Sequence, residues 1–202
     1  SKSTDIWYIT RKNITRSALS FSAKKKKKCM MQLILGGARS GKSRLAEQIA
    51  KDSNLNVTYI ATAQAFDHEM QARIDHHQAQ RPQHWTVIEE PLYLADCLIE
   101  LDQPNQVILV DCLTLCMSNL LMHENAELQM QQCQKLLDIL PILQAEVILV
   151  SNETGLGVIP MGEISRKFVD ESGRLHQQLG QIAEKVIFCV AGFPMMLKGE
   201  KE

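Results

Sequence analysis

The sequence predicts an α/β domain in which a mostly parallel sheet is covered by helices on both faces. From residue 31 onward, short β-branched or aliphatic runs alternate with longer helical patterns, as in chains that build a parallel sheet. The central runs are apolar without alternation, which is typical of strands buried between two layers of helices. A glycine-rich segment directly follows the first run and opens a helical pattern. In such sheets ligands bind beyond the carboxyl ends of the strands.

Each element is expected from its own pattern, in chain order. Strands are expected where β-branched and aliphatic residues cluster, at 32–35, 57–61, 86–89, 107–110, 146–150 and 185–190. Helices are expected between them, at 42–51, 67–79, 92–101, 113–140 with a break near His123, and 164–183. Polar or glycine-bearing residues follow the first five strands, so we expect the functional site at that edge of the sheet.

Length and composition are those of one globular domain. The chain has 202 residues, of which 45% are hydrophobic and 22% charged. A chain of this length can bury a core without disulfides or a structural metal. The six cysteines form no C-x-x-C pair, so we expect free, mostly buried thiols in a reducing cytoplasm.

The first 29 residues differ from the rest of the chain. They hold nine of the 22 lysines and arginines, one acidic residue and no sustained helical or strand period. We interpret residues 1–29 as a disordered, non-native or leader-like extension, and residues 30–202 as the single functional domain. The alternatives are a mitochondrial transit peptide, or a lysine run that contacts acidic lipid or nucleic acid.

The charge and hydropathy of the body limit its partners. Residues 30–202 carry a formal net charge of −9, whereas nucleic-acid binders present a basic surface. Apolar runs such as 107–110 are far shorter than the roughly 20 residues that cross a bilayer. We therefore expect a soluble, cytoplasmic protein that binds neither nucleic acid nor a membrane.

The strongest motif is the segment GGARSGKS, which fits the phosphate-loop pattern G-x-x-x-x-G-K-S between a strand and a helix. In this pattern backbone N–H groups surround a phosphate, the lysine reaches the β- and γ-phosphate oxygens, and the serine hydroxyl binds Mg²⁺. Arg39 either adds charge near a leaving group or is a solvated side chain. Lys42 is also a predicted catalytic residue. The predicted nucleotide-binding residues here are Gly36, Gly37, Ala38, Arg39, Ser40, Gly41, Lys42 and Ser43.

Asp111 ends the strand at 107–110 and has the pattern of a carboxylate that holds Mg²⁺ opposite a phosphate loop. The alternative is that it caps the helix beginning at Leu113. Because the phosphate loop is present, we favour the metal role and predict Ser43 and Asp111 as the metal ligands. Asn152 and Glu153 follow the next strand, where they either position an acceptor or end the strand.

Two adjacent histidines lie on the helix predicted after the second strand. Phe66, Met70 and Ile74 mark its buried stripe and His77 continues that stripe, whereas His76 lies on another side. A neutral imidazole can act as a nucleophile toward phosphorus. The competing interpretation is a histidine without chemical function, and spacing alone does not decide between the two.

Five segments in order carry a specific resemblance: GGARSGKSRLAEQIA, YIATAQAFDHEMQARIDHHQAQRP, VDCLT followed by SNLL, VSNETGLGVIP, and FVDESGRLHQQL. In combination they resemble the bifunctional adenosylcobinamide kinase and adenosylcobinamide-phosphate guanylyltransferase family of cobalamin biosynthesis. The likeness runs from about residue 31 to the C-terminus. It implies a P-loop NTPase fold with a RecA-like sheet, and a homotrimer.

The resemblance implies two reactions that use Mg²⁺, GTP and ATP. The terminal phosphate of a nucleoside triphosphate passes to the aminopropanol hydroxyl of adenosylcobinamide. GMP from GTP then passes to that phosphate, which gives adenosylcobinamide-GDP and pyrophosphate. The resemblance also implies that His76 carries GMP covalently between the steps.

The guanine-nucleotide contacts implied outside the phosphate loop are Ala61, Thr62, Ala63, His77, Gln78, Ala79, Gln80, Glu89 and Asp111. Two departures from the family pattern leave details open. Residues 78–80 stand where a charged residue and glycine are often found, and His176 stands where asparagine is expected. The contacts of 78–80 and any role of the helix containing Arg174 are therefore unassigned.

Two other functions remain open from the residues alone. One is a simpler P-loop kinase of a small metabolite, in which His76 has no chemical role. The other is a nucleotide-binding switch or assembly subunit that hydrolyses slowly and signals by conformation. Covalent labelling of the protein by α-labelled GTP distinguishes the three hypotheses, because only the bifunctional enzyme is expected to form a covalent nucleotide adduct.

Overall fold

A seven-stranded sheet organises the protein in a computed structural model that describes residues 30–63 and 82–200. The strand order is β3-β2-β4-β5-β1-β6-β7, and all neighbours are parallel except β6 and β7. The strands are β1 (Met31–Gly36), β2 (Asn56–Ala61), β3 (Thr86–Glu89), β4 (Gln106–Asp111), β5 (Glu146–Asn152), β6 (Lys185–Val190) and β7 (Phe193–Lys198).

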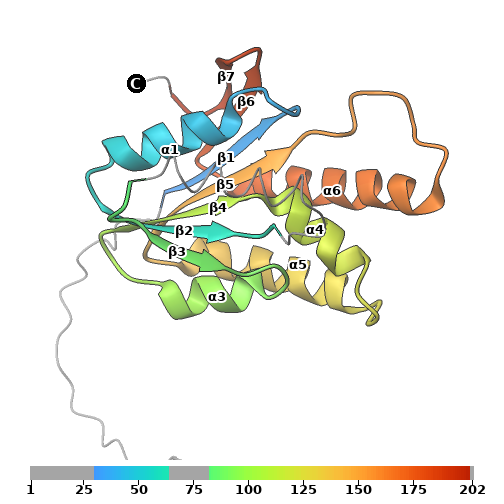
Figure 1. Ribbon diagram of the computed structural model, residues 1–202, viewed down its shortest axis with the longest axis horizontal. Helices are drawn as coiled ribbons and strands as arrows, with labels where there is room; N and C mark the ends of the chain where they lie inside the picture. The colour runs from blue at the N-terminus through green and yellow to red at the C-terminus, as the bar shows by residue number, and fades with distance from the viewer. Residues whose placement is uncertain (1–29, 64–81, 201–202) are drawn as a thin grey trace, which may run out of the picture.

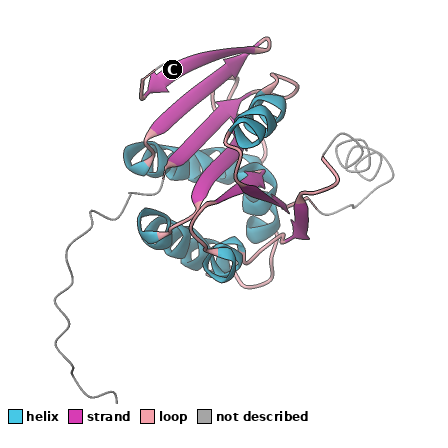
Figure 2. Ribbon diagram, turned by 90° about the vertical axis from the view of Figure 1, so that its left-hand side faces the viewer, coloured by secondary structure: helices cyan, strands magenta, loops and turns pink. Residues whose placement is uncertain are grey.

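Helices cover both faces of this sheet (Figures 1 and 2). The helix α1 lies on one face, and α3 to α6 lie on the other (Figure 1). The helices are α1 (Lys42–Asp52), α3 (Leu94–Leu101), α4 (Leu113–Leu121), α5 (Leu128–Ile139), the 3-10 turn η1 (Leu140–Ile142) and α6 (Glu163–Ile182). None of the helices in residues 30–63 and 82–200 has the length and apolar character that a membrane span requires.

Two apolar cores explain why the central strands lack polar alternation. Successive residues of β5 point to opposite faces, so Val147 and Leu149 pack under α3 to α6, whereas Ile148 and Val150 pack under α1. All four side chains are almost completely buried. The predicted mostly parallel sheet between two helical layers is therefore confirmed.

The strand β5 separates β1 from β4, the strand that ends in Asp111. The phosphate-loop segment itself joins β1 to α1. The predicted fold class is thus confirmed.

The prediction was incomplete at the last strand and approximate at two helices. The strand β7 was missed, because Phe193–Lys198 contains a proline and no β-branched residue; an edge strand tolerates both. The helix expected at 113–140 is divided, since α4 ends at Leu121 and α5 begins at Leu128, in agreement with the break expected near His123. The helix expected at 67–79 lies outside the described residues.

The helix α3 begins at Leu94 rather than at residue 92. The carboxylate of Glu90 explains the later start. Its Oε1 accepts hydrogen bonds from the backbone N–H groups of Leu92 and Tyr93, at 2.9 and 2.7 Å, and so satisfies them in a turn before the helix.

Candidate active site

The predicted site residues of five strands meet at one edge of the sheet. In the parallel register Gly36 is paired with Asn152, and Ala61 is paired with both Asp111 and Glu89. These positions end their strands or lie next to the end, so the segments that follow all leave from the same edge. The structure therefore brings together the phosphate loop, the segment 61–63, Glu89 and Asp111.

The phosphate loop leads from β1 into α1 through two residues in the left-handed region. Arg39 has φ of 56° and Gly41 has φ of 92°, directly before α1 begins at Lys42. A Cβ on Gly41 would lie 3.2 Å from Cα of Gly192, so both conformation and close approach favour glycine. The free N–H groups at the start of α1 face this loop end, which makes it suited to an anion.

A β-hairpin turn holds the loop in place. Ala191 and Gly192, between β6 and β7, have φ of 50° and 83°, as in a two-residue turn of the type I′ class. The N–H of Gly192 donates a hydrogen bond to the backbone carbonyl of Ser40 at 2.9 Å. Sequence reasoning missed this contact because the strand β7 was missed.

Lys42 carries a buried charge at the start of α1. The residue is only 8% exposed, and its Nζ donates a hydrogen bond to the carbonyl of Gly37 at 3.0 Å. Within the described part of the chain no carboxylate lies within ion-pair distance of Nζ. A buried ammonium is unfavourable without an anionic partner, so the site is electrostatically complementary to phosphate.

Two buried side-chain atoms at this edge have no hydrogen-bond partner among the described residues. They are Oγ of Ser40, in the loop, and Oδ1 of Asn152, at the end of β5. Unpaired buried polar atoms are uncommon and mark positions that a ligand can satisfy. Both atoms lie on strands or loops that the register places side by side.

Ser43 and Asp111 offer the hard oxygen ligands that Mg²⁺ prefers. Both residues are half-buried, and no group of three or more His, Cys, Asp or Glu side chains among residues 30–63 and 82–200 forms a metal cage. Mg²⁺ commonly needs no such cage, because it keeps waters and shares one or two carboxylates with substrate phosphates. The residues therefore fit a magnesium ion that binds together with a nucleotide.

The alternative role of Asp111 as a helix cap finds no support in the described residues. The N-cap of α4 is Cys112, and no hydrogen bond joins the Asp111 carboxylate to the first turn of that helix in the ranges that the structure covers. Asp111 instead stays at the edge beside Ala61.

Thr62 joins the ends of two strands. Its hydroxyl donates to the carbonyl of Cys112 at 2.6 Å and accepts from the N–H of Cys112 at 2.9 Å, and the residue is fully buried. The side chain of Asn119 donates to the carbonyl of Thr62 at 3.0 Å and to that of Pro91 at 3.1 Å. These contacts position the ends of β2 and β4. Of the neighbouring predicted residues, Ala61 is buried, Ala63 is half-buried and Glu89 is exposed. The predicted nucleotide contacts of Ala61, Thr62, Ala63 and Glu89 stay predictions.

A buried polar network lies behind the end of β5. The hydroxyl of Thr114 accepts the N–H of Asn152 at 2.6 Å and lies 3.2 Å from Oγ of Ser151. Oγ of Ser151 lies 2.8 Å from Nε2 of His176, a residue of α6. Burial lowers the pKa of His176 below its usual value, although Glu153 opposes the shift. Only the departure of His176 from the family pattern pointed to it in the sequence.

The other residues singled out in the sequence are either exposed or lie outside the described residues. Arg174 is exposed and pairs with Glu171 on its own helix. Arg39 is also exposed. His76, His77, Gln78, Ala79 and Gln80 lie outside the described residues.

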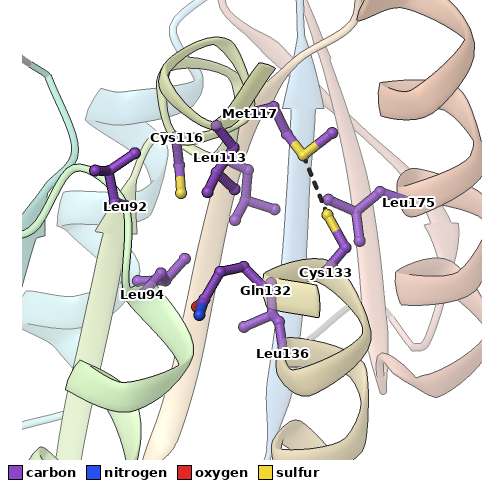
Figure 3. Close-up of a pocket in the computed structure, with 10 residues that line it drawn as sticks. Leu92, Leu94, Leu113, Cys116, Met117, Gln132, Cys133, Leu136 and Leu175 are labelled. Atoms are coloured by element: carbon purple, nitrogen blue, oxygen red, sulfur yellow. Dashed lines mark hydrogen bonds between the residues drawn. The ribbon is translucent and has the colours of Figure 1, made fainter. Parts of the chain in front are cut away.

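An apolar pocket between α3, α4, α5 and α6 is not part of this site (Figure 3). It lies on the sheet face opposite α1, and no charged side chain lines it. Burial raises the pKa of Cys116 to about 12 and that of Cys133 to about 11, so both thiols stay protonated. The pocket is lined by Leu92, Leu94, Leu113, Cys116, Met117, Leu120, Gln132, Cys133, Leu136 and Leu175.

The chain is similar to known proteins over almost all of the described domain. The model of the family "Cobinamide kinase / cobinamide phosphate guanyltransferase" matches residues 32–197. The bifunctional adenosylcobalamin biosynthesis protein CobP of Pseudomonas aeruginosa is 55% identical over 171 residues, which cover 85% of this chain and 99% of that protein. The bifunctional adenosylcobalamin biosynthesis protein CobU of Escherichia coli K12 is 41% identical over 190 residues, which cover 84% of this chain and 100% of that protein.

A solved structure of a Pyrococcus horikoshii OT3 protein superposes with a TM-score of 0.52 at 10% identity, covering 86% of this chain and 88% of that one. That likeness concerns the fold alone. The two sequence relatives are far more similar to this chain, match it over almost their entire length and are named as bifunctional adenosylcobalamin biosynthesis proteins. The chain therefore belongs to the cobinamide kinase / cobinamide phosphate guanyltransferase family, a family of transferases.

Proposed function

We propose that this protein phosphorylates adenosylcobinamide with a nucleoside triphosphate and then transfers GMP from GTP to the new phosphate. The products of the second step are adenosylcobinamide-GDP and pyrophosphate. The observation that carries the proposal is the buried Lys42 in an intact phosphate loop, within a chain that matches the family over residues 32–197. Among the described residues no carboxylate pairs with this lysine. ATP and GTP are both candidate phosphoryl donors.

In the kinase step the phosphate loop holds the triphosphate. Lys42 and the N–H groups at the start of α1 neutralise charge that develops on the β- and γ-phosphate oxygens. Magnesium held by Ser43 and Asp111 would supply further charge neutralisation when bound. The cobinamide hydroxyl oxygen bonds to the γ-phosphorus, and the nucleoside diphosphate leaves with the electrons of the broken bond.

In the guanylyl step His76 is the proposed nucleophile. Its imidazole nitrogen attacks the α-phosphorus of GTP, a P–N bond forms and pyrophosphate leaves, and the same loop neutralises this leaving group. A phosphate oxygen of phosphorylated cobinamide then attacks the α-phosphorus and releases the histidine. The support for His76 is the family resemblance of its segment.

The nucleotide contacts proposed for this step extend along the sheet edge. They comprise the segment 61–63, Glu89 and Asp111, which the register places together, and His77 with residues 78–80. The departure at 78–80 concerns these contacts and leaves the phosphate loop unchanged.

Product analysis tests the proposal directly. Incubation of the protein with adenosylcobinamide, Mg²⁺ and ATP or GTP should yield the phosphorylated corrinoid, and addition of GTP should convert it to the GDP adduct. A simple kinase would stop at the first product. A nucleotide switch would give neither corrinoid product and would release only inorganic phosphate.

We also propose that residues 30–202 act as one catalytic domain. The family match lies within this range, and β1 begins at Met31. A protein beginning at Met30 is expected to keep both activities and its melting temperature. A large loss of either would show that residues 1–29 contribute to the folded enzyme.

The assembly that we propose is a cytoplasmic homotrimer. The edge strand β7 exposes Phe193, Met195 and Leu197, apolar side chains that subunit contacts would cover. The five cysteines of the described residues are free thiols, which suits a reducing compartment. Light scattering on the purified protein measures the subunit number, and a monomer would overturn the trimer.

A further inference from the structure

Glu153 lies between the two groups that the kinase step uses. The strand β5 separates β1, which leads into the phosphate loop, from β4, which ends in Asp111. Glu153 is the first residue beyond β5, and its N–H donates a hydrogen bond to the carbonyl of Gly36 at 3.0 Å. Its side chain therefore starts at the same edge, beside the loop.

The carboxylate of Glu153 is held in one orientation and is still accessible. Oε1 accepts the N–H of Gly155 at 2.6 Å, and Oε2 lies 3.7 Å from Nδ1 of His176. The side chain is 21% exposed, whereas that of His176 is 9% exposed. A substrate can thus reach a carboxylate whose position is fixed from the protein side.

One arrangement of protons gives every group in the network behind His176 a hydrogen-bond partner. A backbone N–H can only donate, so Thr114 accepts from Asn152 and is free to donate its own proton to Ser151. Ser151, which is 1% exposed, then donates to Nε2 of His176. In this arrangement the proton of the neutral ring is on Nδ1, facing the carboxylate of Glu153.

The charge state of the ring matters for the carboxylate. Because burial lowers the pKa of His176, the ring is neutral and orients Glu153 without cancelling its negative charge. Glu153 remains a strong hydrogen-bond acceptor. The end of a strand does not by itself require such a network of four side chains, which are Thr114, Ser151, His176 and Glu153.

We propose that Glu153 accepts the hydrogen bond and then the proton of the corrinoid hydroxyl in the kinase step, and that His176 is its positioning residue. The hydroxyl oxygen bonds to the γ-phosphorus, and the bond from the γ-phosphorus to the β,γ-bridging oxygen breaks with its electrons leaving on the nucleoside diphosphate. The hydroxyl proton passes to Oε2 of Glu153 and then to solvent.

This role belongs to one half-reaction only. It rests on the proposed kinase function, in which the acceptor is a hydroxyl that loses a proton. In guanylyl transfer the acceptor is a phosphate that is already ionised, so it requires no base. Glu153 should therefore separate the two activities.

The first test assays both half-reactions of the full-length protein with Glu153→Gln. The kinase kcat with adenosylcobinamide and ATP is expected to fall roughly 10²- to 10⁴-fold with little change in KM for ATP. Guanylyl transfer to adenosylcobinamide phosphate should persist, and Glu153→Asp, which keeps the carboxylate, should retain more kinase activity than Glu153→Gln. Equal loss of both activities, or an unchanged kinase kcat, would overturn the proposal.

The second test compares two amides at His176. Asparagine places its amide near the position of Nδ1, facing Glu153, whereas glutamine reaches toward the position of Nε2, facing Ser151. His176→Asn is expected to keep the kinase kcat within several-fold of wild type, and His176→Gln to lower it at least tenfold further. If His176→Asn and His176→Gln have equal melting temperatures and equal kcat values, His176 contributes only to packing, and its positioning role is overturned.

The wild-type enzyme separates this inference from the proposed function. If it forms no phosphorylated corrinoid, the proposed function fails and the role of Glu153 fails with it. If it forms that product and Glu153→Gln forms it equally fast, only the inference fails.

Discussion

Lys42 shows how one buried side chain connects the fold to the chemistry. The residue is 8% exposed, and its ammonium group has only a carbonyl partner in the described residues. Lys42→Ala should weaken nucleotide binding by about 1.5–3 kcal/mol, the value of a charge-assisted hydrogen bond, and should impair both half-reactions. Calorimetry with GTP and the two product assays measure this. Unchanged kinase activity together with lost guanylyl transfer would mean that the steps do not share one loop.

The buried His176 predicts a pH dependence of stability. Its folded-state pKa lies below the unfolded value of about 6.5, because burial disfavours the charged ring. Between those two pKa values the unfolded chain binds more protons, so stability is full above about pH 6.5 and falls as the pH drops toward the folded pKa. Denaturant unfolding of wild type and His176→Asn at several pH values measures the difference. Parallel curves for the two proteins would contradict the assignment.

At the scale of elements, the β6–β7 hairpin supports the phosphate loop. Gly192 has φ of 83°, and its N–H donates a hydrogen bond to the carbonyl of Ser40. Its Cα would lie 3.2 Å from a Cβ added to Gly41. Gly192→Ala should cost about 1–2 kcal/mol of unfolding free energy through left-handed strain and should also weaken GTP binding.

Gly199 provides the matched control for this hairpin. It has φ of 96°, and an added Cβ would lie 2.9 Å from the carbonyl of Glu184, near the start of β6 and away from the loop. Gly199→Ala should destabilise the protein without a change in GTP affinity. If both variants lose affinity equally, the hairpin has no specific effect on the loop.

Which elements could be predicted depended on how local their signals are. The strands of the central sheet and the phosphate loop are encoded in runs of a few residues, and their positions were confirmed to within about two residues. The contact of Thr62 with Cys112 and that of Ser151 with His176 join residues that are 50 and 25 positions apart. No periodicity reports such pairs, so the sequence indicated these residues only through their places in family segments.

At the scale of the whole molecule, the parallel sheet gathers dispersed short segments at one edge. The phosphate loop, Asp111 and Glu153 follow three strands that lie side by side, although more than a hundred residues separate the first from the last. In the mechanism that we propose, this arrangement lets one nucleotide site serve two transfers to different acceptors. The acceptor of that mechanism would change from a hydroxyl to a phosphate, while the loop that neutralises the leaving group would stay the same.

Covalent labelling by α-labelled GTP tests the bifunctional mechanism most directly. Wild type should take up acid-labile, alkali-stable label, and uptake should fade below about pH 6.5, where the imidazole is protonated and has no lone pair for attack. His76→Ala should take up none and keep measurable kinase activity, whereas His77→Ala should still be labelled to some extent. Label on His76→Ala, or none on wild type that retains kinase activity, would contradict the covalent role of His76.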